Sequence, residues 1–135
     1  KNVTNMSGMF QTATAFNKPL NWDVSNVTNM TDMFLAAESF NQPLNNWNVG
    51  NVTNMSNMFS DCKLYNQPLN DWNVSNVSNF SAMLSSASEF NQPLDTNNFK
   101  TNKAKNLSGM FKGAKTQLSN ALSTTCWQKG PISSE

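Results

Sequence analysis

The chain has 135 residues, a mass of 15.0 kDa, 13% charged residues and a net charge of +1. This length fits one domain with a continuous core, and the charge argues against a protein that neutralises nucleic-acid phosphates. The sequence lacks His, the commonest general base and metal ligand, so we expect no enzyme activity, no cofactor and no metal.

A motif of about 25 residues recurs along the chain. "NVTNMSGMF" begins at Asn2, and related copies begin at Asn26, Asn51 and Asn76, with a degenerate copy at Lys103. The copies are 24 to 27 residues apart, measured at one apolar position: Met6, Met30, Met55, Phe80 and Leu107. Spacing varies only before the aromatic residue that closes each unit, which indicates a surface loop there.

In each unit, the spacing of apolar residues predicts a short helix. In residues 30–40 they stand at Met30, Met33, Phe34, Ala37 and Phe40, which is helical spacing. A hydroxyl residue after the first apolar position is expected to cap this helix: Ser7, Thr31, Ser56, Ser81 and Ser108. An Asn and then a Pro, as in Asn41 and Pro43, are expected to end it.

After this helix, Trp47-Asn-Val49 and its equivalents alternate apolar and polar residues, which predicts a short strand. We therefore predict an α/β solenoid at residues 1–115, resembling a leucine-rich repeat. It is a right-handed coil of about five units of 24–27 residues, each with a short strand, a turn and a short helix. Residues 116–128 are predicted to form a C-terminal capping helix, and residues 129–135 a tail.

We call a set of equivalent positions in successive units a column. Two kinds of column in this repeat can be interpreted either as structural or as functional. The asparagines before inward Met and Val positions, such as Asn29 and Asn26, are interpreted as ladders that satisfy backbone groups. The aromatic column at Trp22, Trp47 and Trp72 either lies in the core, which we favour, or stacks against sugar rings at the surface.

The segment "FNQPLNNWNVGNVTNMSNMF" at residues 40–59 resembles the BspA-like leucine-rich-repeat surface proteins, including mycoplasma-type surface lipoprotein repeats. Copies of it cover most of the chain up to Lys115. The resemblance implies a bacterial cell-surface or extracellular location, a role in adhesion and no catalytic activity. Because the chain begins at Lys1, without an initiator Met, we expect a fragment of a larger anchored protein.

The polar positions beside the aromatic column are the candidate ligand-binding residues. If the aromatic residues and Val point inward, their neighbours form a polar strip on the sheet face, at steps of about 4.8 Å. This strip comprises Asn21, Asp23, Asn46, Asn48, Asp71, Asn73, Asn98 and Lys100. An alternative is ordinary solvated surface. The lysines from Lys100 onward are either a second, basic candidate region for acidic partners or, as we favour, a solvated cap.

We therefore expect a non-catalytic surface repeat domain that binds a host or neighbouring-cell protein or glycan. The alternative is a structural spacer that displays another domain, and a further one is a crystal-binding plane on Thr4, Thr28 and Thr53. No apolar run is long enough to insert into a membrane. The exposed first coil makes end-to-end self-association possible. Cys62 and Cys126 are expected to be free thiols, too far apart to form a disulfide.

Overall fold

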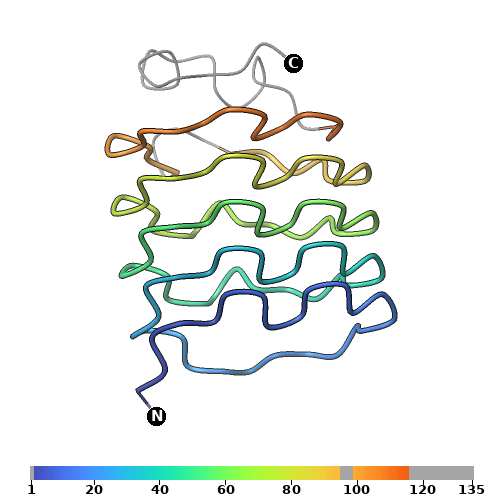
Figure 1. Cartoon of the computed structure of the whole chain (residues 1–135), viewed down its shortest axis with the longest axis horizontal. Helices are drawn as coiled ribbons and strands as arrows, with labels where there is room; N and C mark the ends of the chain where they lie inside the picture. The colour runs from blue at the N-terminus through green and yellow to red at the C-terminus, as the bar shows by residue number, and fades with distance from the viewer. Residues whose placement is uncertain (1, 95–98, 116–135) are drawn as a thin grey trace.

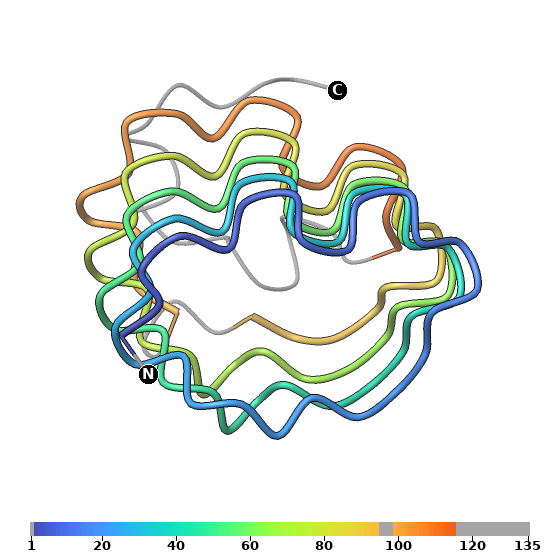
Figure 2. The same ribbon diagram turned by 60° about the horizontal axis from the view of Figure 1, so that its bottom comes forward.

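The computed structural model describes residues 2–94 and 99–115 of the chain. The backbone winds into coils that stack on one another from the N-terminus upward (Figure 1). Seen from a second angle, successive coils follow nearly the same path (Figure 2). Four parallel β-bridges join one asparagine in each coil to its equivalent in the next: Asn5, Asn29, Asn54, Asn79 and Asn106. One coil therefore corresponds to one sequence repeat.

The predicted α/β solenoid of leucine-rich-repeat type is wrong. Within residues 2–94 and 99–115 no segment is helical, and β-structure is confined to the isolated bridges. The predicted helix at residues 30–40 is a succession of tight turns. The predicted strand at Trp47 forms no bridge, so the described residues contain neither of the two elements expected in each unit.

Alternating hydrogen bonds build this succession of turns. The Met33 N–H donates to the Met30 carbonyl, 3.2 Å away within the same coil. The next N–H, that of Phe34, donates to the carbonyl of Met58 in the following coil, at 2.9 Å. An α-helix would satisfy both donors within its own segment. Here every second donor instead links two coils, so the stacking of coils replaces helix formation.

Backbone conformation explains why the helix does not form. Asp32 and Ala36 adopt left-handed dihedral angles, with φ of 59° and 60°, and a left-handed residue interrupts an α-helix of L-residues. The column equivalent to Asp32 contains mostly residues that tolerate this conformation: Gly8, Asp32, Asn57, Ala82 and Gly109. The apolar spacing of the repeat fits a helix and these turns equally well, but the Gly/Asp/Asn column favours the turns.

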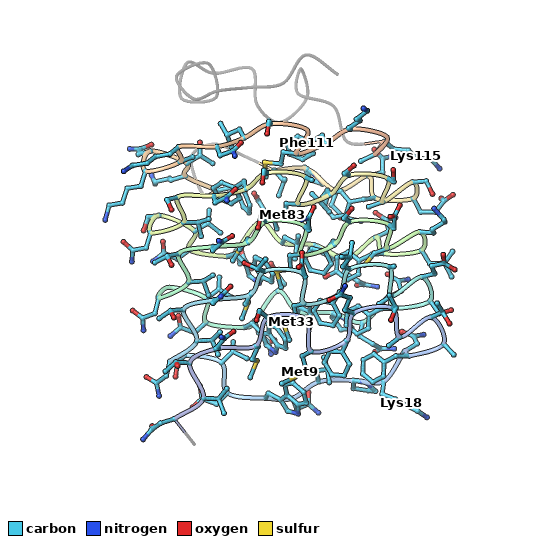
Figure 3. All side chains as sticks on the ribbon, in the orientation of Figure 1. Met9, Lys18, Met33, Met83, Phe111 and Lys115 are labelled. Carbon is cyan, nitrogen blue, oxygen red and sulfur yellow. The ribbon has the colours of Figure 1, made fainter. Side chains whose placement is uncertain are left out.

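The core consists of apolar columns that continue from coil to coil. Met33, Met58 and Met83 are fully buried, and Figure 3 shows two of them, Met33 and Met83, at different levels of the stack. Phe10, Phe34 and Phe59 stack with ring centroids 5.5 Å apart at each step. Each coil thus covers the apolar side chains of the next, which a single coil cannot do alone.

Asparagine side chains bond to backbone groups, as predicted. Some of these bonds lie within one coil and others join neighbouring coils. Each asparagine of the bridge column accepts, through its side-chain oxygen, a hydrogen bond from the backbone N–H two residues later at 2.9–3.0 Å. The donors are the residues predicted to cap helices: Ser7, Thr31, Ser56, Ser81 and Ser108. These residues therefore donate backbone N–H groups and cap no helix. A ladder between coils forms at Asn17, Asn41 and Asn66, where each Oδ1 accepts an Asn N–H of the next coil at 2.9 Å. The predicted helix ends are therefore links between coils.

Several predictions fall beyond the residues that the structure describes. The predicted capping helix at 116–128, the tail at 129–135, Asn98 and Cys126 lie outside them. Cys62 is a buried free cysteine. Within residues 2–94 and 99–115 there is no helix with the length and hydrophobicity of a membrane span.

Candidate functional site

The candidate residues immediately precede and follow the aromatic residue of each unit in the sequence. Trp47 and Trp72 are buried, which confirms the core interpretation for these two side chains. Phe99 is buried at the same position of the next coil, whereas Trp22, in the first coil, is partly exposed. The polar neighbours are exposed: Asn21, Asp23, Asn46, Asn48, Asp71, Asn73 and Lys100.

These neighbours do not lie on a β-sheet, contrary to the sequence prediction. The bridges lie instead one segment later, in the Val-Thr-Asn stretch. Side chains link the aromatic segments of successive coils. The indole N–H of Trp47 donates to the Leu20 carbonyl at 3.1 Å, and that of Trp72 to the Leu44 carbonyl at 2.8 Å. Each Trp thus fixes its segment to the coil before it.

Three candidate residues line one surface hollow. Its volume is about 280 Å³, and it is lined by Asn21, Pro43, Asn45, Asn46 and Asp71. The residues come from three successive coils, so the hollow exists only because the coils stack. Pro43 and Asn45 were not among the predicted site residues. Asn45 belongs to the segment of variable length before the aromatic residue, and that variation was the available signal.

A reciprocal pair of hydrogen bonds holds one wall of this hollow. Asn45 Nδ2 donates to Asp71 Oδ2 at 2.8 Å, and the Asp71 N–H donates to Asn45 Oδ1 at 3.0 Å. The second carboxylate oxygen of Asp71 has no bond to Asn45. The wall therefore offers a positioned acceptor beside the amides of Asn21 and Asn46.

The other predicted column is engaged in turns. Oδ1 of Asp23, Asn48 and Asn73 accepts the N–H two residues later at 3.0 to 3.1 Å. Hydrogen bonds from the hydroxyl and the amide of Ser25 lower the pKa of Asp23 below its ordinary value, so this carboxylate is charged at neutral pH. The structure thus separates the two columns: one surrounds the hollow and the other shapes turns.

Two of the lysines toward the C-terminal end have polar side-chain partners. Lys103 Nζ donates to Asn76 Oδ1 at 2.8 Å, and Lys115 Nζ lies 3.0 Å from Glu89 Oε1. Lys100 is exposed, and Lys129 is outside the described residues.

Two buried groups could carry chemistry, but neither is accessible. Burial raises the pKa of the Cys62 thiol from 9.0 to about 12, so the thiolate, which is the reactive form, is suppressed. Burial also raises the pKa of Tyr65. Within the described part of the chain, no group of three or more His, Cys, Asp or Glu side chains is arranged to hold a metal ion.

Comparison with curated proteins and with solved structures gives no match. A family model does match, over residues 1–96 and again over residues 51–128. The overlapping matches span nearly the whole chain, as expected where a repeat can be aligned in more than one register. The chain therefore belongs to the family described as Mycoplasma protein of unknown function, DUF285.

Proposed function

We propose that this chain is a non-catalytic surface repeat domain that binds a polar ligand, a glycan or an extended peptide, at the hollow lined by Asn21, Asn46 and Asp71. The observation that carries the proposal is that the hollow coincides with an outward polar column of the repeat. The family match agrees with a bacterial origin. The resemblance to BspA-like surface proteins is the basis for proposing a surface location and a role in adhesion.

The chemistry of the hollow suits a ligand rich in hydroxyl or amide groups. Asn21 and Asn46 each offer a donor and an acceptor, and Asp71 offers an acceptor. Pro43 adds a small apolar surface to the lining. Such a mixture can bind sugar hydroxyls or a peptide backbone, and the lining contains no Ser, Cys, His or Lys side chain. This is the basis for proposing binding without catalysis.

The test is direct binding of the chain to arrays of glycans, mucins and matrix proteins, with Asn46→Lys as the site variant. Asn46 is exposed and lines the hollow, so the added side chain should fill it with little effect on folding. Leu64→Lys is the matched control, because Leu64 is 53% exposed and does not line the hollow.

We expect saturable binding that Asn46→Lys lowers at least tenfold and Leu64→Lys leaves unchanged. Binding that both variants retain would move the site away from the hollow. The absence of binding to every array member would favour the second candidate, a spacer that displays another domain.

The spacer has its own supporting observation. The same inter-coil bonds recur at successive junctions, as in the N–H bonds from Met30 and Met55 to the next coil at 3.0 and 2.9 Å. Uniform junctions extend a stack without altering it. For a spacer, deleting one coil from the parent protein should leave adhesion of the whole cell intact, whereas a binding domain should lose affinity for its own ligand.

A further inference from the structure

Asp71 carries the one formal charge among the five residues that line the hollow. The equivalent positions of the first and second coils carry Asn21 and Asn46, so the third coil replaces a neutral amide with a carboxylate. Both ion pairs among the described residues use other carboxylates, those of Asp61 and Glu89. The negative charge of Asp71 therefore has no cationic partner in the described part of the chain.

Hydrogen bonds in the wall of the hollow leave one oxygen of this carboxylate available. Asp71 Oδ2 accepts from Asn45 Nδ2 at 2.8 Å, and the Asp71 N–H returns a bond to Asn45 Oδ1 at 3.0 Å. These two bonds hold the side chain of Asp71 in one orientation. Asp71 Oδ1 accepts no hydrogen bond from another described residue. It is a charged acceptor in a fixed position that lacks a protein donor.

Two amide oxygens complete the set of available acceptors. The side chains of Asn21 and Asn46 line the hollow and make no hydrogen bond with another described residue. Each amide can turn its oxygen toward a ligand. Together with Asp71 Oδ1, three successive coils then contribute one oxygen each. A primary ammonium has three N–H donors and no acceptor, so it matches three oxygens of which one is charged.

We propose that the hollow binds the ammonium group of a lysine side chain carried by an extended peptide of another protein. This inference rests on the proposed function, which makes the hollow a binding site, and it names the group that the hollow selects. Pro43 supplies an apolar surface for the alkyl stem of the lysine, since such stems commonly lie along apolar surface. An amino sugar has no comparable stem.

The same contacts argue against three other ligands. A guanidinium binds a carboxylate best through two parallel bonds, and Asp71 Oδ2 is already bonded to Asn45. A sialylated or sulfated glycan would bring a second negative charge to Asp71. Calcium takes about six to eight oxygen ligands, more than the free side-chain oxygens of this lining.

The experiment is an NMR titration of the full chain with short blocked peptides, read at the side-chain amide of Asn46 and the backbone N–H of Asp71. The probe peptide has one lysine between glycine and serine residues. Matched peptides carry Nε-acetyllysine, arginine or glutamate in its place. We expect saturable shifts with the lysine peptide and about tenfold weaker binding of the Nε-acetyllysine peptide, which has lost the charge and two N–H donors. Added salt should weaken binding of the lysine peptide, because it screens exposed charges.

Two matched substitutions separate the charge of Asp71 from the net charge of the chain. Asp71→Asn removes the charge from the hollow and introduces the residue that positions 21 and 46 already carry, so the coil should keep its fold. Asp23→Asn makes the same change at a residue that does not line the hollow, and it introduces the residue that positions 48 and 73 carry. We expect Asp71→Asn to abolish the preference for lysine over Nε-acetyllysine and Asp23→Asn to retain it.

Several results would overturn the preference for a lysine ammonium. These are equal affinity for the lysine and Nε-acetyllysine peptides, a preference that survives Asp71→Asn, and tighter binding of the arginine peptide or of a glucosamine oligomer. Displacement of the lysine peptide by calcium chloride would assign the oxygens to a metal ion and would also overturn it. The comparison of the two lysine peptides on the unaltered chain does not depend on the folding of any variant.

The titration also distinguishes failure of this inference from failure of the proposed function. Shifts at Asn46 with a neutral glycan or with the Nε-acetyllysine peptide, but none with the lysine peptide, would overturn the ammonium preference and leave the hollow as a polar binding site. The absence of shifts at Asn46 with every peptide and glycan would contradict both.

Discussion

Tyr65 is a single departure from an otherwise uniform phenylalanine column, Phe16, Phe40 and Phe90. Its ring stacks on Phe40 with centroids 5.8 Å apart, but its buried hydroxyl has no hydrogen-bond partner among the described residues. A buried hydroxyl without a partner costs about 1–3 kcal/mol. Tyr65→Phe should therefore raise the free energy of unfolding by about 1 kcal/mol, measured by urea denaturation.

The reciprocal change at an equivalent position is the control for this prediction. Phe40→Tyr places a hydroxyl in the same buried environment, so it should lower the free energy of unfolding by about 1 kcal/mol or more. If Tyr65→Phe instead destabilised the chain, the hydroxyl would have to make a stabilising bond.

Ala82 and Gly109 occupy equivalent left-handed positions, with φ of 54° and 65°. An L-residue with a Cβ is strained there, and glycine is not. Ala82→Gly should therefore stabilise the chain by about 0.5 kcal/mol, after the entropy that glycine gains on unfolding is subtracted. Gly109→Ala should destabilise it by a similar amount, and thermal unfolding measures both.

The space around Gly109 makes this pair informative. A Cβ there would meet no atom within 4 Å, so a loss of stability reports the backbone conformation and not a steric clash. An unchanged Tm for Gly109→Ala would show that the backbone at this position can leave the left-handed region without penalty.

Alkaline pH should destabilise the fold through Cys62 and Tyr65. Burial raises the pKa of the thiol from 9.0 to about 12 and also raises the pKa of the phenol. The unfolded chain ionises first as pH rises, so stability is intact below pH 9.0 and falls between there and about pH 12. The thiol contributes a slope of about 1.4 kcal/mol per pH unit. The phenol adds a similar slope above pH 10.0, its ordinary pKa.

Cys62→Ala tests this dependence with a residue that the column already contains at Ala37 and Ala87. The variant should lose less stability than the unaltered chain when urea denaturation is compared below and above pH 9.0. Identical curves for the two proteins would mean that the thiol ionises in the folded state. Below pH 9.0 the native thiol should resist thiol reagents until the chain unfolds.

At the scale of the element, sequence patterns located the inward residues well and the backbone structure poorly. Burial of Met30, Phe34 and Trp47 follows from their apolar columns. The error was to interpret spacings of three and four as a helix, although consecutive four-residue turns have the same spacing. Only the alternation of bonds within and between coils distinguishes them, and that depends on contacts 23 to 26 residues away.

The asparagine ladder links successive coils through side-chain hydrogen bonds at Asn17, Asn41 and Asn66. Asn66 Oδ1 accepts from the Asn91 N–H and from Gln92 Nε2, at 2.9 and 3.0 Å. Asn66→Leu removes the acceptor and should cost about 1–3 kcal/mol, whereas Asn66→Asp keeps an acceptor and should cost less. Equal losses for the two variants in urea denaturation would show that the oxygen is not the important group.

At the scale of the whole molecule, the equivalence of the junctions predicts that one coil is dispensable for folding. Removing residues 51–75 joins Gly50 to Asn76 and stacks the fourth coil on the second with the same partners. The shortened chain should fold cooperatively with a lower Tm, because one coil and one junction are lost. A non-cooperative thermal transition would contradict the independence of the junctions.

The candidate site was predictable only in part, and the reason is geometric. Alternation around Trp47 and Trp72 indicated that Asn46 and Asp71 are exposed, which they are. It could not indicate that Asn45 bonds to Asp71, 26 residues away, or that Pro43 completes a hollow. Those features arise where variable segments of three coils meet, and their conformations depend on one another.

The direction of the hydrogen bonds between coils has a mechanical consequence. These bonds run along the stack, so a force applied to the two ends of the chain strains one junction at a time. When a junction opens, about 25 residues become free and lengthen the tether by about 80–90 Å. A chain held between two cells would then extend in steps. It could re-form its coils when the load falls, because each coil would pack again on the neighbouring coil, which has stayed folded.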